Sequence, residues 1–166
     1  SEIANWIVEG DEVEAYLGHE VNTAGDVNGD GFADVIISAL KHLKPEAAFL
    51  YYGSAEGLPD TPAWTACSDR PDAWLGKSVA PAGDVNGDGY TDIIVGAARY
   101  DVSYPAEFRE GWALVFHGGP NGVSLVPNWV SEGDQDNASF GISVSTAGDV
   151  NGDGYADIIV GDDQYD

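Results

Sequence analysis

Residues 26–34 read Asp-Val-Asn-Gly-Asp-Gly-Phe-Ala-Asp, and nearly the same nine residues return at 84–92 and at 149–157. The copies are offset by 58 and then by 65 residues. Each copy follows an Ala-Gly pair and leads into a run rich in Ile and Val. Because self-similarity at a near-constant spacing is the sequence signature of repeat proteins, we expect three copies of one structural unit.

Two further features keep these offsets: a Leu-Gly or Phe-Gly pair and a tryptophan. The pairs are Leu17-Gly18, Leu75-Gly76 and Phe140-Gly141. The tryptophans are Trp6, Trp64 and Trp129. Since they recur at one position of the unit, we expect these tryptophans to pack between or along the units. Trp74 and Trp112 do not recur, and could face a ligand or cover the core.

Each unit is predicted to contain four short strands and almost no helix, because no segment sustains a 3.6-residue apolar period. The first strands are expected at 18–24, 76–82 and 141–147, and the second at 34–38, 92–96 and 157–161. The third are expected at 47–52 and 112–117, and the fourth at 5–9, 63–67 and 127–131. The second strands are apolar on both faces, as in strands buried between sheets.

Repeated units of about 60 residues with four strands favour an all-β fold of β-propeller blades, each made of four antiparallel strands. The chain would hold about two and a half blades. We place the last strand of a preceding blade at 1–11, a blade at 12–69, a blade at 70–134 and a partial blade at 135–166. A β-sandwich is the alternative, but a sandwich does not need the same loop in every hairpin.

The repeated loop carries side-chain oxygens at its positions 1, 3, 5 and 9, and the Gly at position 6 permits a sharp turn around an ion. With the backbone carbonyl of position 7, and water or a bidentate Asp, it supplies the six to eight hard oxygens that Ca²⁺ prefers. We therefore expect three Ca²⁺ sites. Their ligands would be Asp26, Asn28, Asp30, Phe32 and Asp34; Asp84, Asn86, Asp88, Tyr90 and Asp92; and Asp149, Asn151, Asp153, Tyr155 and Asp157.

Other interpretations of the loop are weaker. Mg²⁺ prefers a rigid octahedron and keeps more waters, and Zn²⁺ is disfavoured because no loop holds His or Cys. An EF-hand needs an acidic ligand at position 12, where this chain has Ile37, Val95 and Val160. A turn rich in Asn, Asp and Gly that binds no ion is the remaining alternative.

The charge of the chain is strongly negative, with 29 Asp and Glu against 6 Lys and Arg, a formal net charge of −23. Such a surface repels nucleic acid and anionic lipid, and it suits cations, although solubility alone could explain it. No stretch approaches the roughly 20 apolar residues of a membrane-spanning helix, so we expect no membrane insertion. Cys67 is the single cysteine and cannot form an intramolecular disulfide.

The repeated elements together resemble the FG-GAP repeat of integrin α-subunit propellers and related bacterial surface proteins. Phe140-Gly141 matches the "FG" element, and Leu17-Gly18 and Leu75-Gly76 are its variants. Gly53 and Gly118 stand where the "GAP" element falls, although neither reads Gly-Ala-Pro. The resemblance covers nearly the whole chain. It implies a β-propeller, of seven blades in the full family member, with Ca²⁺ in the loop between the first two strands of each blade.

The second unit is longer than the first by seven residues, which lie between Gly96 and Gly118 and so form a loop. This loop holds aromatic and Arg side chains, which are favoured at recognition surfaces. The resemblance implies that it lies on the face opposite the calcium loops, where ligands dock. A hairpin that packs on its own blade is an equal alternative. The candidate ligand-binding residues are Arg99, Tyr100, Tyr104, Phe108 and Arg109.

The sequence contains no nucleophile motif, phosphate-binding loop or His-Glu-x-x-His pattern, so we expect no enzymatic activity. We expect a calcium-binding module, with structural Ca²⁺, for extracellular or cell-surface adhesion or recognition of protein or glycan. The alternative is a non-catalytic accessory part of a secreted hydrolase or lyase. Open blade edges are an aggregation liability, and they make a homo-oligomer through these edges possible.

Overall fold

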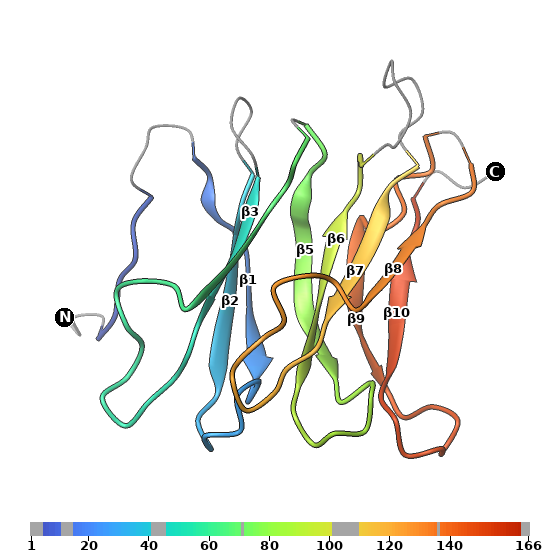
Figure 1. The fold of residues 1–166 in the computed structure, drawn as a ribbon. Coiled ribbons are helices and arrows are strands. Elements are labelled where there is room, and N and C mark those ends of the chain that lie inside the picture. Colours follow the sequence, from blue (N-terminus) through green and yellow to red (C-terminus); the bar gives the residue numbers. More distant parts are fainter. Residues whose placement is uncertain are drawn as a thin grey trace.

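The structure is a computed structural model that describes residues 5–10, 15–40, 46–70, 72–100, 110–135 and 137–163. Within these ranges it contains ten strands and no helix, and thus none long and apolar enough to cross a membrane (Figure 1). The strands are β1 (Leu17–Gly25), β2 (Asp34–Ala39), β3 (Ala47–Tyr51), β4 (Trp64–Cys67), β5 (Leu75–Gly83), β6 (Asp92–Ala97), β7 (Trp112–Phe116), β8 (Trp129–Glu132), β9 (Ser143–Gly148) and β10 (Asp157–Gly161).

The strands form three antiparallel sheets that stand side by side (Figure 1). Two sheets have four strands each, in the orders β1-β2-β3-β4 and β5-β6-β7-β8, and the third pairs β9 with β10. Within each sheet, every strand is therefore hydrogen-bonded to the next along the chain, as in propeller blades. The predicted all-β fold of repeated four-stranded blades is confirmed, with a third sheet of two strands. The limits predicted for each blade stay predictions.

One predicted strand is wrong. Residues 5–9 are not in a strand, and the described residues provide no neighbouring backbone ladder for them. An extended segment becomes a β-strand only when a partner strand takes up its backbone hydrogen bonds. All other predicted strands are present, and their ends differ from the prediction by at most two residues.

Strand β6 lies between two apolar cores because its side chains alternate between its faces. Ile93 and Val95 belong to the core between the first two sheets, together with Leu50. Ile94 faces the other way, into the core shared with Val144 of the third sheet. All three β6 side chains are fully buried, which explains why this strand reads as an apolar run on both faces.

Two of the recurrent tryptophans make equivalent contacts. Trp64 lies edge-on to Phe116 of the second sheet, with ring centres 5.0 Å apart, and its Nε1 donates to the Ser124 carbonyl at 2.9 Å. Trp6 meets Tyr51 in the same way, at 5.3 Å, and its Nε1 donates to the Pro59 carbonyl at 3.0 Å. Trp64 therefore joins neighbouring blades, as predicted, and Trp6 makes the same contact without belonging to a strand.

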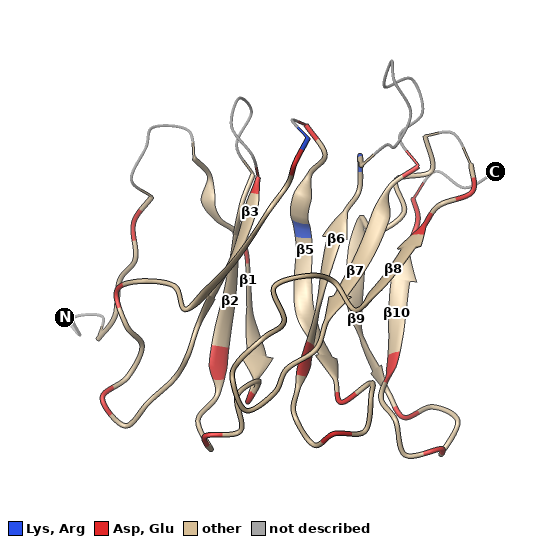
Figure 2. Ribbon diagram, in the orientation of Figure 1, with Lys and Arg blue, Asp and Glu red and all other residues tan. Residues whose placement is uncertain are grey.

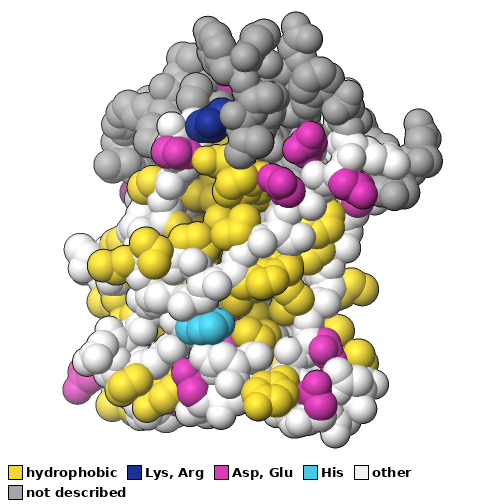
Figure 3. Space-filling view, turned by 45° about the vertical axis from the view of Figure 1, so that its right-hand side comes forward, with side chains coloured by type: hydrophobic (Ala, Val, Ile, Leu, Met, Phe, Trp, Pro, Cys, Tyr) yellow, Lys and Arg dark blue, Asp and Glu magenta, His cyan; other side chains and the backbone are white. Residues whose placement is uncertain are grey.

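Apolar side chains are exposed on β8, the edge strand of the second sheet, and on β10 of the third sheet. Trp129 is 42% exposed, Val130 41% and Ile159 60%, whereas the equivalent Trp64 is only 4% exposed. Figure 3 turns this side of the molecule forward and shows apolar side chains spread over it. The expectation that Trp129 packs between blades is not met within the described residues, because these contain no third strand next to β10.

Candidate metal centres

The three repeated loops lie together at one end of the sheets (Figure 1). Each joins the first strand of a sheet to the second, over residues 26–33, 84–91 and 149–156. Figure 2 marks acidic residues in all three loops, while the described Lys and Arg residues lie nearer the other end. Short hairpin connections of one sequence therefore place three acidic loops on one face.

The Asp26 carboxylate, at position 1, organises the first loop. Its Oδ1 accepts the backbone N–H groups of Gly29 at 2.7 Å and Asp30 at 3.1 Å. Its Oδ2 accepts the N–H of Gly31 at 2.9 Å. Gly29 and Gly31 have φ of 75° and 89°, a left-handed conformation that glycine adopts without strain. The two glycines thus allow the chain to curl around this carboxylate.

Positions 3 and 5 are bonded to each other. Asn28 Nδ2 donates to Asp30 Oδ2 at 2.9 Å, and the Asp30 N–H donates to Asn28 Oδ1 at 3.0 Å. Asp30 Oδ1 accepts the N–H of Phe32 at 2.9 Å. Both polar side chains are therefore held within the loop, beside the carboxylate of position 1.

Asp34, at position 9, is fully buried where the loop enters β2. Its Oδ2 accepts the Val27 N–H at 2.9 Å, and its Oδ1 accepts the Gly53 N–H at 2.8 Å. Burial raises the pKa of this carboxyl, the two N–H bonds lower it, and the charges of Asp30 and Asp26 raise it further. Asp34 therefore ties the loop to the end of β3, at the cost of holding a third carboxylate near two others.

The second and third loops repeat these bonds. Asp84 accepts the N–H groups of Gly87, Asp88 and Gly89, and Asp149 accepts those of Gly152, Asp153 and Gly154. These bonds, with the Gly154 N–H as the largest cause, lower the pKa of Asp149. Three loops of one sequence therefore adopt one conformation.

The ninth residue of the second loop, Asp92, is fully buried like Asp34, and burial raises its pKa. It accepts the Gly118 N–H at 2.8 Å and the Val85 N–H at 2.9 Å. In the third loop, Asp157 accepts the Val150 N–H at 2.9 Å. The position 9 carboxylate thus closes all three loops.

The oxygens of each loop suit a hard cation. Among the described residues, no three His, Cys, Asp or Glu side chains converge as the ligands of one ion, and the Asp26 and Asp34 carboxylates accept backbone N–H groups. Carboxylate, amide and carbonyl oxygens are nevertheless the donors that Ca²⁺ prefers, and the Asp34 carboxylate uses only two of its lone pairs. The mutual repulsion of Asp26, Asp30 and Asp34 would also be relieved by a divalent cation.

Neighbouring loops touch one another. The Thr91 N–H donates to the Asp26 carbonyl at 3.1 Å, and the Ala156 N–H donates to the Asp84 carbonyl at 2.8 Å. The Tyr90 ring of the second loop lies against the backbone of the first, so that a Cβ added at Gly29 would meet its Cε1 at 2.5 Å. Tyr155 lies against Gly87 in the same way, at 2.6 Å. The aromatic residue at position 7 thus covers the preceding loop.

The loops, the strand order and the spacing agree with comparisons to known proteins. The profile of the FG-GAP repeat matches residues 20–40, 75–111 and 140–166, about half of the chain. The chain belongs to the FG-GAP repeat family. The family accounts for the regular offset of the three loops.

Similar proteins to this FG-GAP chain include integrin α subunits. Integrin alpha-5 of Xenopus laevis is 30% identical over 92% of the chain, and integrin alpha-V of Gallus gallus is 31% identical over 92%. Integrin alpha-IIb of Mus musculus is 32% identical over 93%. The chain spans about 15% of the length of these relatives.

Two of the predicted ligand-binding residues of the FG-GAP chain lie in the described part. The Arg99 guanidinium lies 3.4 Å from the centre of the Trp74 ring. The Tyr100 ring lies 4.1 Å from that of Trp112, and its hydroxyl donates to Asp69 at 2.9 Å. Arg99 therefore packs on Trp74, and Tyr100 packs on Trp112, so both side chains lie against their own blade.

The other three predicted residues, Tyr104, Phe108 and Arg109, lie outside the described residues. A ligand-binding role of the inserted loop thus stays a prediction.

The sequence did not single out Glu46, which precedes β3 and is 1% exposed. Burial raises the pKa of this carboxyl, whereas backbone N–H groups of Glu46 itself, Trp74 and Ala73 lower it. In the described part of the chain, its Oε2 has no hydrogen-bond partner. Glu46 does not recur, since the equivalent residue of the second blade is Gly111, and a search for repeated residues passes over it.

Proposed function

We propose that the chain is a calcium-stabilised FG-GAP module for extracellular or cell-surface adhesion or recognition of a protein or glycan. The observation that carries the proposal is the triple occurrence of one acidic loop with one set of hydrogen bonds at one end of the sheets. Family membership and the integrin α relatives support the same function.

The residues at positions 1, 3, 5, 7 and 9 of each loop would hold Ca²⁺, giving three sites. Bound Ca²⁺ would neutralise the clustered carboxylates and fix the turn into the second strand of each blade. The chain's own part is to preorganise the site: N–H groups of Gly29, Asp30 and Gly31 orient Asp26, and the Val27 and Gly53 N–H groups orient Asp34. Calcium is therefore structural in this proposal, and the chain itself is not an enzyme.

The partner would be a protein or a glycan outside the cell. Integrin alpha-5 and integrin alpha-V are similar over 92% of the chain, which supports an adhesive role at the cell surface. A net charge of −23 opposes binding to nucleic acid or to anionic lipid. Association of copies through open blade edges is part of the same proposal, supported by the exposure of Trp129 on β8 and Ile159 on β10.

The test is a binding assay with the immobilised chain against a panel of extracellular-matrix proteins and a glycan array. It is run in excess Ca²⁺ and again after chelation with EDTA. We expect at least one specific partner in Ca²⁺, with binding lost in EDTA because the loops then lose their cation. The absence of any partner, or binding that EDTA leaves unchanged, would contradict the proposal.

A further inference from the structure

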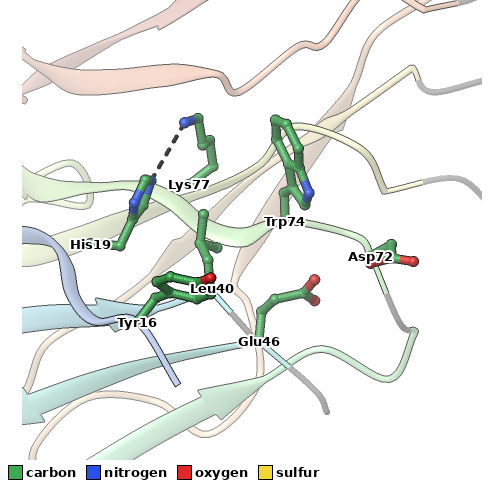
Figure 4. Close-up of a pocket in the computed structure, with 7 residues that line it drawn as sticks. All are labelled: Tyr16, His19, Leu40, Glu46, Asp72, Trp74 and Lys77. Carbon is green, nitrogen blue, oxygen red and sulfur yellow. Dashed lines mark hydrogen bonds between the residues drawn. The ribbon is translucent and has the colours of Figure 1, made fainter. Parts of the chain in front are cut away.

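A pocket of about 300 Å³ lies between the first and second sheets, at the end opposite the acidic loops. Figure 4 shows the seven side chains that line it. They are Tyr16, His19, Leu40, Glu46, Asp72, Trp74 and Lys77. They come from the start of β1, the residue after β2, the residue before β3, and β5 with the connection that leads into it, so both of the first two blades line this pocket.

The floor of the pocket contains an unsatisfied hydrogen-bond acceptor. Glu46 is 1% exposed, yet its Oε2 has no hydrogen-bond partner among the described residues, and Figure 4 shows the carboxylate directed toward the Trp74 side of the pocket. Buried polar atoms are nearly always hydrogen-bonded, and one that is not points to a bound group or a functional role. A ligand that donates a hydrogen bond to Glu46 Oε2 would satisfy it.

The opposite wall offers hydrogen-bond donors. Lys77 Nζ lies 3.4 Å from His19 Nε2 and 5.4 Å from the centre of the Trp74 ring. The Arg99 guanidinium lies closer to that ring, at 3.4 Å. Tyr16 adds a phenolic hydroxyl at the mouth, where it is 60% exposed.

The charges of these side chains restrict the class of ligand. A cationic ligand would meet Lys77 and Arg99, which already lie over the Trp74 ring. An anionic ligand would meet the carboxylates of Glu46 and Asp72. A neutral ligand that both donates and accepts hydrogen bonds has no such conflict.

We propose that this pocket binds a neutral, hydroxyl-rich group, the chemistry of a free monosaccharide or of a neutral sugar in a glycan. A ligand hydroxyl would donate to Glu46 Oε2, while Lys77 and Tyr16 would donate to ligand oxygens. Leu40 and Trp74 would cover its C–H surface. The volume is at the lower end of the range for small-molecule sites, which suits one sugar ring. This inference rests on the proposed recognition function and narrows its ligand to a glycan.

The test uses saturation-transfer NMR on the whole chain in Ca²⁺. The probes are the methyl glycosides of glucose, galactose, mannose and N-acetylglucosamine, with acetate and methylguanidinium as charged probes. We expect transfer to at least one sugar and to neither charged probe. Transfer to no sugar, or stronger transfer to a charged probe, would overturn the assignment.

Two variants locate the binding. Glu46→Leu removes the acceptor Oε2 and replaces the side chain by an apolar one of similar size. Tyr16→Phe removes one exposed hydroxyl with little risk to folding. We expect sugar affinity to fall by at least about tenfold in Glu46→Leu and severalfold in Tyr16→Phe, because a site loses its selectivity when a hydrogen-bonding partner is removed. Glu56→Leu, at an exposed turn between β3 and β4, is the matched control and should bind as the wild type does. Equal binding by all three variants would overturn the proposal.

The two proposals fail in different ways. If matrix proteins bind in Ca²⁺ and no sugar does, the module function stands and the pocket assignment is wrong. If the sugar binds through Glu46 but EDTA changes neither stability nor partner binding, the calcium proposal is wrong and the pocket stands.

Discussion

Asp34 and Asp92 show how much one residue of the nine-residue loop does. Each carboxylate is fully buried and bonds two backbone N–H groups, one in its own loop and one just after the third strand. Each therefore joins the loop between the first two strands to the segment that follows the third strand. Charge-assisted bonds of this kind are among the strongest in proteins, while the buried charge itself is costly.

Replacing Asp92 by Ala should remove both of these bonds and leave the N–H groups of Val85 and Gly118 unsatisfied. We expect a loss of about 2–4 kcal/mol in the free energy of unfolding, measured by urea denaturation in Ca²⁺. Asp92→Asn keeps one acceptor oxygen and is the matched control, with a smaller loss. If Asp92→Ala unfolds with the same free energy as the wild type, these two hydrogen bonds do not contribute to stability.

Glu46 should give a pH-dependent effect. Burial raises its pKa above the ordinary value of 4.5, so the folded state disfavours the charged form. Wild-type stability is then complete below the ordinary pKa and declines as the pH rises through the raised pKa, whereas Glu46→Gln has no such decline. The melting temperature of Glu46→Gln relative to wild type should therefore increase between about pH 4 and pH 7. A difference in melting temperature that stays constant over that range would contradict a raised pKa of the Glu46 carboxyl.

At the scale of the element, local sequence predicted the strands well and their partners less well. The β-branched runs at β2 and β6 and the glycine-rich loops before them are encoded within a few residues, and repetition reinforced the signal. The prediction of a strand at 5–9 was wrong, because a strand forms only beside a partner strand and the local sequence pattern does not show whether one is present.

The residues of the candidate sites also differ in how far the sequence predicts them. The carboxylates at positions 1 and 9 of the loops could be identified because their spacing recurs three times. Glu46 could not, because its burial depends on the packing of residues 72–77 beside the start of β3, and no local pattern marks such an acid.

The tryptophans allow a matched test of blade packing. Trp64 is 4% exposed and contacts Phe116 of the next blade, whereas Trp129 occupies the same position and is 42% exposed. Trp64→Ala should lower the free energy of unfolding by about 3–5 kcal/mol, since it removes a buried aromatic side chain. Trp129→Ala should cost markedly less in urea denaturation. Equal losses would mean that Trp129 is also buried in solution.

At the scale of the whole molecule, neighbouring blades are connected both through their cores and through their acidic loops. β6 contributes to cores on both of its faces, and the position 7 residues Tyr90 and Tyr155 each cover the loop of the preceding blade. A change in one loop should therefore affect the neighbouring blade through this direct contact. Acidic residues gather on the loop end of this assembly, so the energy of the fold should depend on a cation there (Figure 2).

Thermal unfolding in excess Ca²⁺ and in excess EDTA tests the claim that three Ca²⁺ ions stabilise the blades. A ligand at 100 times its Kd adds about 2.7 kcal/mol per site, and in a domain of this size each kcal/mol raises Tm by about 2–4 °C. Three sites should therefore raise Tm by more than about 10 °C over the value in EDTA, with Mg²⁺ giving little of this effect. The same Tm in Ca²⁺ and in EDTA would contradict the account.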